Sequence, residues 1–266
     1  MRAIASRILP LAIGMLLAGA QAGVAAAERS IEEIQACAHK NLPERSARQE
    51  VSFVIRDATG AEESIEAELF WKRGPDGRSR VLIRVGAPPD LRGAAFLLIE
   101  REGDSDLFTY LPALQKVRRI SGRAISGSLF GTDFSYEDVE RLQSLVLETK
   151  VERQPDVEVA GRNTHVLSAL LPPDPASTYT RVVSYVDAQT CVALRTDLLN
   201  KDGMVNKELI IAAEDVKPEG TRFVPREVLA RDRDKGSETR LRIEKIEYDL
   251  PLSEKFFSEA ALAKGH

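Results

Sequence analysis

From Gln49 onward, apolar and polar residues alternate in short segments separated by turns that contain glycine, proline or aspartate. In Ile65–Lys72 the odd positions are apolar and most even positions are charged, which is typical of a strand with one buried face. The alternation in Arg80–Val85 is looser but has the same period. The predicted strands are Val51–Arg56, Ile65–Lys72, Arg80–Val85, Ala94–Glu100, Leu107–Leu111, Lys116–Ile120, Leu145–Arg153, Thr164–Leu171, Tyr179–Asp187, Val192–Leu199, Val205–Val216, Thr221–Arg231 and Thr239–Tyr248.

Helical patterns are confined to three places, Ser30–Lys40, Tyr136–Leu142 and Glu254–Ala263. The first begins with Ser30 and has Glu33 three positions later, and the second begins after Ser135 with Asp138 three positions later. These are the spacings of a helix N-cap. Because helices are few and the strands follow at hairpin spacing, the pattern predicts a mainly β protein with an antiparallel sheet. About eleven to thirteen strands in one sheet must curl, which creates a concave apolar face that a helix covers or a ligand fills.

The N-terminal segment has the pattern of a secretory signal peptide. Arg2 and Arg7 form a positively charged region before the apolar run Ile8–Ala18, and the small residues at 25–27 precede Glu28. The run is shorter than the roughly 18 residues that a membrane-spanning helix needs. We therefore predict that residues 1–27 are a cleaved signal peptide. We expect residues 28–266 to form a single domain that is soluble in the periplasm after cleavage.

Charge and cysteine content narrow the possible partners. The formal net charge is −4 at pH 7, and the expected mature chain has no long block of lysines and arginines, which argues against a nucleic-acid partner. Cys37 and Cys191 are the two cysteines. In an oxidising compartment we expect them to form a disulfide that joins the first helix to a strand near the middle of the sheet. Two free buried thiols are the alternative, since sequence positions do not give the geometry.

Searches for catalytic motifs find no specific signal. The chain contains no glycine-rich phosphate loop, no paired-cysteine metal motif and no nucleophile elbow. Its histidines, His39, His165 and His266, are not at metal-ligand spacing from one another. We therefore predict no catalytic residues, no metal and no cofactor.

An aromatic segment after the basic strand Lys116–Ile120 is a candidate gate. Leu129, Phe130, Phe134 and Tyr136 lie in a stretch rich in glycine and serine. Apolar side chains in such a segment are typical of a lid over a pocket or of a contact with a partner. The alternative is that Phe130 and Phe134 are ordinary core residues.

Three arginines are candidates for contact with a lipid headgroup or a partner protein. They are Arg92, Arg118 and Arg119. The alternative for Arg118 and Arg119 is that they simply alternate with Val117 and Ile120 along a strand.

Several short motifs, in this order, resemble the LolA-like periplasmic outer-membrane lipoprotein-sorting family, in particular its branch found beside RND-type lipid exporters. The matching segments are Asn41–Pro43, Leu69–Arg73, Pro89–Gly93, Tyr110–Leu114, Val117–Ile120, Gly131–Asp138, Tyr179 and Val186–Asp187 before Cys191. The resemblance implies a strongly curved, unclosed (half) barrel of about eleven antiparallel strands. It also implies helices that cover a hydrophobic cavity.

The resemblance implies a carrier rather than an enzyme. Its cavity would hold acyl chains of a lipid or lipoprotein in transit toward the outer membrane, with an inner-membrane RND-type transporter and an outer-membrane acceptor as partners. Because the disulfide and the long Gly131 block depart from the lipoprotein carriers, a hopanoid, sterol or glycolipid is also a candidate cargo. The candidate lining residues are Leu69, Trp71, Val81, Ile83, Phe96, Leu98, Phe108 and Tyr110.

Two other functions remain open. A lipid-sensing regulator of the envelope stress response can have the same fold, although such sensors usually carry a second domain. An extracytoplasmic lipid hydrolase would need a serine or threonine beside a histidine and an acid. His165 beside Thr164 is the one candidate for that arrangement.

Overall fold

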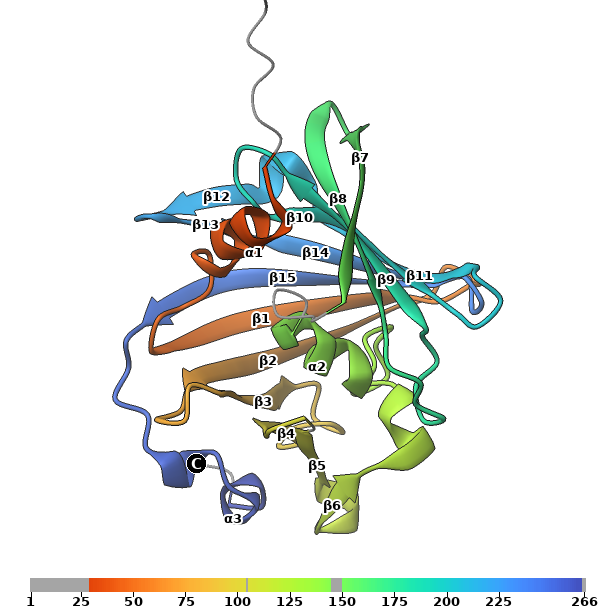
Figure 1. Cartoon of the computed structure of the whole chain (residues 1–266). Coiled ribbons are helices and arrows are strands. Elements are labelled where there is room, and N and C mark those ends of the chain that lie inside the picture. The colour runs from red at the N-terminus through yellow and green to blue at the C-terminus, as the bar shows by residue number, and fades with distance from the viewer. Residues whose placement is uncertain (1–28, 104, 145–149, 265–266) are drawn as a thin grey trace, which may run out of the picture.

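Thirteen strands pair side by side in one large antiparallel sheet within residues 29–103, 105–144 and 150–264, which this computed structural model describes (Figure 1). The order is β6-β5-β4-β3-β2-β1-β15-β14-β11-β10-β9-β8-β7, so β6 and β7 are the edges and the sheet is not closed into a barrel. The strands are β1 Ser46–Arg56, β2 Glu62–Arg73, β3 Ser79–Ala87, β4 Ala95–Glu100, β5 Ser105–Leu111, β6 Lys116–Ile120, β7 Val151–Val159, β8 Arg162–Leu170, β9 Arg181–Asp187, β10 Ala193–Leu199, β11 Val205–Ile210, β14 Glu227–Asp232 and β15 Ser237–Tyr248. The predicted mainly β half-barrel is confirmed, with thirteen strands in the sheet where about eleven were expected.

A small hairpin is inserted in the chain between β11 and β14, two strands that are neighbours in the sheet. It consists of β12 Val216–Glu219 and β13 Arg222–Pro225, which pair only with each other. The predicted single strands Val205–Val216 and Thr221–Arg231 are therefore wrong, because each is divided between the main sheet and this hairpin. The chain leaves β11, makes the short 3₁₀ helix η3 (Ala213–Asp215) and returns as β14 beside β11.

The helices begin where the sequence predicts. Helix α1 (Ile31–His39) has a full capping box, in which the Ser30 hydroxyl accepts from the Glu33 N–H at 3.2 Å and Glu33 accepts from the Ser30 N–H. Helix α2 (Tyr136–Ser144) has the same reciprocal pair, because Ser135 and Asp138 exchange bonds of 2.7 and 3.0 Å. Each cap satisfies N–H groups that the first helical turn leaves without a partner.

The C-terminal segment is less helical than predicted and covers the convex face of the sheet. It contains the 3₁₀ helix η4 (Glu254–Phe256) and the one-turn helix α3 (Glu259–Leu262). Its side chains complete an apolar cluster on β2–β5 whose buried members are Phe70, Leu82, Ala95, Leu97, Ile99, Phe108, Phe257 and Leu262. Arg84 reinforces the contact by donating to the Ala261 carbonyl at 3.2 Å.

The chain itself fills the concave face of β1–β6. Phe53, Trp71 and Phe96 from the strands form one buried cluster with Leu129 and Phe134 from the segment before α2. The Phe134 ring meets the Phe53 ring edge-on, with centroids 6.2 Å apart. We call β1–β6 with residues 121–144 the filled half, and β7–β11, β14 and β15 the open half.

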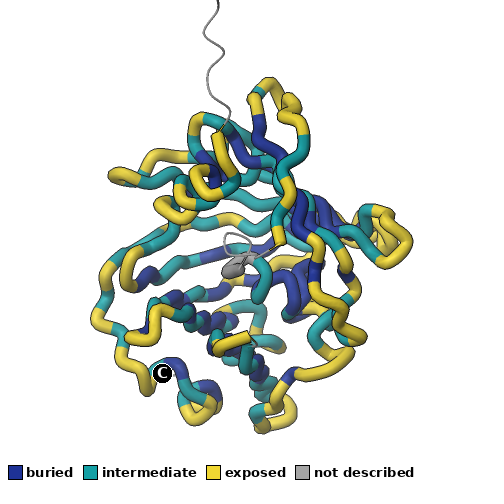
Figure 2. The backbone as a smooth tube through the Cα atoms, in the orientation of Figure 1, coloured by how far each residue is buried: buried dark blue, intermediate teal, exposed yellow. Residues whose placement is uncertain are grey.

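The open half has a different cover. Helix α1 and the β12–β13 hairpin lie beside each other over this end of the sheet, at the top of Figure 1. Buried stretches follow the strands beneath them, whereas most of the connecting turns are exposed (Figure 2). A cavity with a largely apolar wall lies in the space between this cover and the sheet.

No helix in the described residues is long and apolar enough to cross a membrane. The predicted signal peptide, residues 1–27, lies outside the described part of the chain, as do residues 145–149 of the predicted strand Leu145–Arg153.

Candidate functional site

A cavity of about 320 Å³ lies between α1, the β12–β13 hairpin and the concave face of the open half. This volume is within the range of small-molecule sites, which begins at roughly 300 Å³. Aliphatic side chains from all three elements form much of its wall, among them Ile34, Leu167, Val182, Val186, Leu209 and Val224.

The wall of the cavity carries no formal charge. Among the described residues that line it there is no aspartate, glutamate, lysine, arginine or histidine. Its polar members are Gln35, Asn41, Gln49, Ser184, Thr196 and Tyr248. A charged group buried here would lose its hydration without gaining a counter-ion, so the cavity favours apolar or uncharged ligands.

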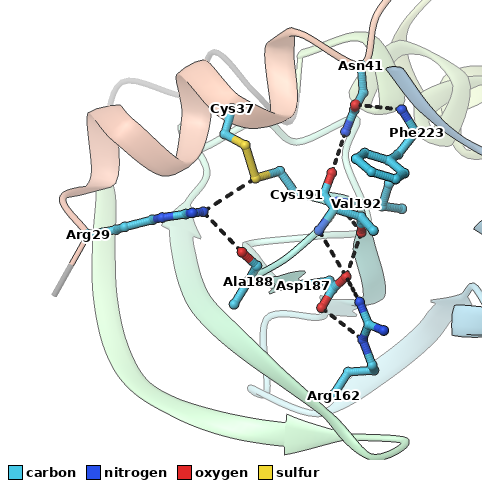
Figure 3. The surroundings of a disulfide bond; sticks show 10 residues. Arg29, Cys37, Asn41, Arg162, Asp187, Ala188, Cys191, Val192 and Phe223 are labelled. Carbon is cyan, nitrogen blue, oxygen red and sulfur yellow. Dashed lines mark hydrogen bonds and ion pairs between the residues drawn. A yellow bond between two sulfur atoms is a disulfide. The ribbon is translucent and has the colours of Figure 1, made fainter. Parts of the chain in front are cut away.

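A disulfide fixes the helical cover to the sheet. Cys37 in α1 is bonded to Cys191, with 5.8 Å between the Cα atoms (Figure 3). Next to it, Arg29 donates to the Ala188 carbonyl at 3.2 Å and contacts the Cys191 sulfur at 3.6 Å. The predicted pairing is confirmed, but its placement needs a correction. Cys191 lies in the turn between β9 and β10 rather than in a strand near the middle of the sheet.

Asn41 connects the three elements that surround the cavity. Its amide nitrogen donates to the Thr190 carbonyl in the β9–β10 turn at 2.8 Å. Its amide oxygen accepts from the backbone N–H of Phe223 in the hairpin at 2.9 Å (Figure 3). One side chain at the end of α1 therefore holds both the turn and the hairpin.

A buried carboxylate shapes the turn that carries Cys191. Asp187 accepts two hydrogen bonds from the Arg162 guanidinium, at 2.7 and 3.2 Å, and one from the Thr190 hydroxyl at 2.6 Å. Burial alone raises the pKa of Asp187, but these hydrogen bonds outweigh it and hold the pKa below its ordinary value of 3.8. Cys191 itself adopts a left-handed backbone conformation, with φ at 57°.

The residues that sequence reasoning proposed as lining lie elsewhere. Six of the eight are on the concave side of β2–β4 in or against the cluster of the filled half: Leu69, Trp71, Val81, Ile83, Phe96 and Leu98. Phe108 and Tyr110 are on the opposite, convex face, against the C-terminal segment. None of the eight is among the described residues that line the cavity.

The four gate candidates lie within the filled half. Leu129, Phe130 and Phe134 are buried, and Tyr136 is half-buried against the same cluster. The Leu129 N–H donates to the Phe134 carbonyl at 2.8 Å, which closes a tight loop. Phe130 has a φ of 54°, a left-handed conformation that is strained for a phenylalanine.

Two buried aspartates tie this loop and α2 to the sheet. Asp133 accepts from the hydroxyls of Ser237 and Thr239 on β15, at 2.5 and 2.7 Å. Asp138 accepts from the Lys207 ammonium of β11 at 2.5 Å, in an ion pair that is almost fully buried. The loop is thus firmly held in this conformation, and its role as a gate stays a prediction.

The candidate arginines are spread along one end of the sheet. Arg118 and Arg119 are exposed on the edge strand β6, where Arg119 forms an ion pair with Asp106 at 2.7 Å. Arg92 lies between β3 and β4 and donates to the Gly86 carbonyl at 2.9 Å. Their contact with a headgroup or partner also stays a prediction.

The candidate hydrolase pair does not come together. His165 contacts Asp156 through Nδ1 at 2.8 Å, but the Thr164 hydroxyl donates to the Val157 carbonyl at 2.8 Å. Adjacent residues on a strand point to opposite faces of the sheet, so the Thr164 side chain points away from the His165 imidazole. This location offers no activated nucleophile.

Sequence reasoning missed the residues that surround the cavity. Asn41–Pro43 is one of the motifs that resemble the LolA-like family, and all three of its residues line the cavity, a position that the motif alone does not predict. The signal that could have found the site was the pair Cys37 and Cys191, because a bonded helix must lie close to the turn that it is bonded to.

Comparison with known proteins gives a consistent set of structural relatives. A family model described as "-like: Uncharacterized protein" matches residues 77–264, which is more than half of the chain. A DUF1329 family protein from Desulfovibrio piger has 25% identity and a TM-score of 0.80, covering 87% of this chain and 97% of its own. No curated protein matches the chain.

Two further structures have the same fold. A domain named for outer-membrane lipoprotein sorting, from Vibrio parahaemolyticus, has 24% identity and a TM-score of 0.79, covering 88% of this chain and 98% of its own. A LolA superfamily protein from Nitrosomonas europaea has 17% identity and a TM-score of 0.69, covering 88% and 100%.

Proposed function

The chain belongs to the family whose model matches residues 77–264 and has the fold of a LolA superfamily protein, and from this premise we propose that it is a periplasmic carrier of lipids or lipoproteins. In this proposal residues 1–27 are removed as a signal peptide and residues 28–266 form a single soluble domain. The domain binds the apolar part of its cargo and moves it toward the outer membrane. It acts as a binding protein rather than as an enzyme, and an RND-type transporter is its inner-membrane partner.

The single observation that carries the proposal is the uncharged, largely aliphatic cavity under α1 and the β12–β13 hairpin. Each methylene of a lipid tail that leaves water for such a wall contributes about 0.8 kcal/mol. The part of an apolar tail that enters this cavity therefore gains free energy relative to water. A protein with this cavity can carry an apolar molecule between two membranes.

We also propose roles in cargo transport for the remaining candidate residues. We assign contact with the partner or with a lipid headgroup to Arg92, Arg118 and Arg119 at the β6 end of the sheet. We assign the release of cargo to the loop of Leu129, Phe130, Phe134 and Tyr136, which packs on the concave face of β1–β4. Both assignments follow from the exposure of the arginines and the left-handed backbone at Phe130.

The test is identification of the bound molecule in the secreted protein. The protein is purified from the periplasm without detergent, its mass is measured by native mass spectrometry, and the lipids are extracted and identified. We expect a lipid adduct in the wild-type protein. A protein that carries no lipid and binds no acyl probe would contradict the proposal.

A matched pair of variants places the lipid in the cavity. Ala169 lines the cavity on β8, and Leu170, the next residue, is exposed on the other face of the same strand. Ala169→Phe fills the space and should remove the adduct, whereas Leu170→Phe adds an aromatic ring outside it and should keep the adduct. Thermal unfolding checks that both variants are folded.

A further inference from the structure

A row of hydroxyl groups crosses the apolar wall of the cavity. The strand register places Leu167, Ser184, Thr196 and Leu209 directly opposite one another on β8, β9, β10 and β11. All four line the cavity, so the two hydroxyl-bearing residues at the centre of the row face the same space between leucines. On β9, Val182 and Val186 flank the row at the neighbouring wall positions.

These two hydroxyls have no protein partner in the described part of the chain. No hydrogen bond joins the side chain of Ser184 or Thr196 to any described group; Thr196 is 3% exposed and Ser184 is half-buried. Neither oxygen is among the fully buried polar atoms that lack a partner, so both hydroxyls are reachable from the cavity, and a purely apolar ligand that displaced water from them would cost about 1–3 kcal/mol for each. Two such hydroxyls side by side in a cavity indicate that something in the cavity bonds to them.

The chemistry of the wall limits what that partner is. A serine or threonine hydroxyl donates one hydrogen bond and accepts others, so the pair suits a single hydroxyl or carbonyl oxygen. An ionised carboxylate or phosphate is disfavoured, because no cationic side chain is among the described residues of the wall. A plain alkyl chain would leave both hydroxyls unsatisfied.

We propose that Ser184 and Thr196 form a recognition site for one uncharged oxygen of the cargo, and that the cargo is a neutral lipid with a hydroxyl or ester carbonyl inside the cavity. This inference rests on the proposed carrier function and specifies its substrate class. It excludes two classes of cargo: an ionised fatty acid, and a lipid that inserts only hydrocarbon into the cavity. Specificity arises because the site loses its hydrogen bonds when the oxygen is missing.

The experiment compares two probes that differ only in that oxygen. Dodecan-1-ol and 1-chlorododecane have the same chain length, but the chloride neither donates nor accepts a strong hydrogen bond. Each is delivered from cyclodextrin and competes with a fluorescent apolar probe, 1-N-phenylnaphthylamine, bound to the secreted protein. We expect the wild-type protein to bind the alcohol about tenfold more tightly than the chloride, the effect of one or two hydrogen bonds.

The variants assign that preference to the hydroxyl row. Ser184→Ala combined with Thr196→Val should reduce the preference to about twofold or less and leave the affinity for the chloride unchanged or higher. Thr221→Val makes a similar change in the exposed turn of the β12–β13 hairpin and should keep the wild-type preference. Because valine and alanine suit a strand, the double variant is expected to fold, and thermal unfolding verifies this.

The outcomes separate this inference from the carrier function. If the wild-type protein binds both probes equally, or the double variant keeps the tenfold preference, the cavity binds lipids but the hydroxyl row is not its recognition site. If neither probe displaces the fluorophore, the carrier function fails and the inference with it. Tighter binding of dodecanoate than of dodecan-1-ol would overturn the assignment to neutral lipids.

Discussion

The two halves of the sheet have similar strands but different contents. In the filled half, aromatic side chains from the segment before α2 occupy the concave face, and Phe134 packs edge-on against Phe53. In the open half, α1 and the hairpin cover the concave face without filling it, and a cavity of about 320 Å³ remains. The strands on both sides alternate in the same way. The difference therefore lies in which segments of the chain cross each half.

The attachments of the two covers differ as well. The loop of the filled half is held by buried carboxylates that bond to β15 and β11. The cover of the open half is held at its margin, by the Cys37–Cys191 disulfide and by Asn41. Anchors at the margin keep a cover in place and leave the space beneath it free. We expect mutations to distinguish the halves accordingly.

The largest expected effect is loss of an aromatic ring from the filled half. Phe134→Ala should lower the free energy of unfolding by about 3–5 kcal/mol, because it leaves a void in a packed cluster. The matched change in the open half is Phe223→Ala, in a half-buried residue that lines the cavity, and should cost less than half as much. Urea denaturation of both variants measures the difference. Equal costs would remove the distinction between the halves, and a stable Phe134 variant that retains no lipid would identify a gate.

Removal of the disulfide comes next. Cys37 and Cys191 are 154 residues apart, and closing a loop of that length restricts the unfolded chain strongly. Replacing both with serine should lower the free energy of unfolding by about 2–4 kcal/mol. The wild-type protein denatured with a reductant should match the variant. A variant as stable as the oxidised protein would show that the open half does not depend on this anchor.

Asn41→Ala should have a smaller and more local effect. It removes two hydrogen bonds and leaves the Phe223 N–H without its partner, at a cost of about 1–3 kcal/mol. Amide hydrogen exchange should become faster in the hairpin, residues 216–225, and remain unchanged in β2–β4 of the filled half. Faster exchange in both regions would mean that the halves open together.

The smallest effect is on the acid dependence of stability. The folded state holds the pKa of Asp187 below its unfolded value, so the ionised carboxylate contributes stability above that value and loses it as the pH falls through the folded pKa. Asp187→Asn should therefore be less stable than the wild type at pH 7, and the difference should shrink below about pH 4. Urea denaturation at pH 7, 5 and 3 measures this. Arg162→Gln should weaken the same acid dependence, because Arg162 donates two hydrogen bonds to Asp187. If the difference in stability between the wild type and Asp187→Asn stays constant with pH, the titration of Asp187 is not linked to folding.

The sequence was sufficient for the fold and for the anchors but not for the position of the cavity. Strand alternation, the Ser30–Glu33 and Ser135–Asp138 caps and the disulfide are local or countable signals, and the structure confirms them. Alternation identifies a buried face but not what buries it. Trp71 lies on such a face, yet a distant loop fills the space in front of it.

The hairpin was missed for a related reason. The predicted strands Val205–Val216 and Thr221–Arg231 each join strand-like residues across a weak break, Ala212–Asp215 in the first and Pro225 in the second. Pro218 and Pro225 were the available hint, since proline donates no hydrogen bond and favours short or edge strands. Both are in the two-stranded hairpin.

The place of that hairpin has a consequence for how such proteins diversify. Because β11 and β14 pair directly, the sixteen residues between Ile210 and Glu227 form a detour in an otherwise uninterrupted ladder. Their number and chemistry can change without shifting the register of any neighbouring strand. The strands that form the wall of the cavity and the hairpin that covers it can therefore change sequence independently of each other. Exchanging the hairpin alone is a route to a cavity of different size on the same sheet.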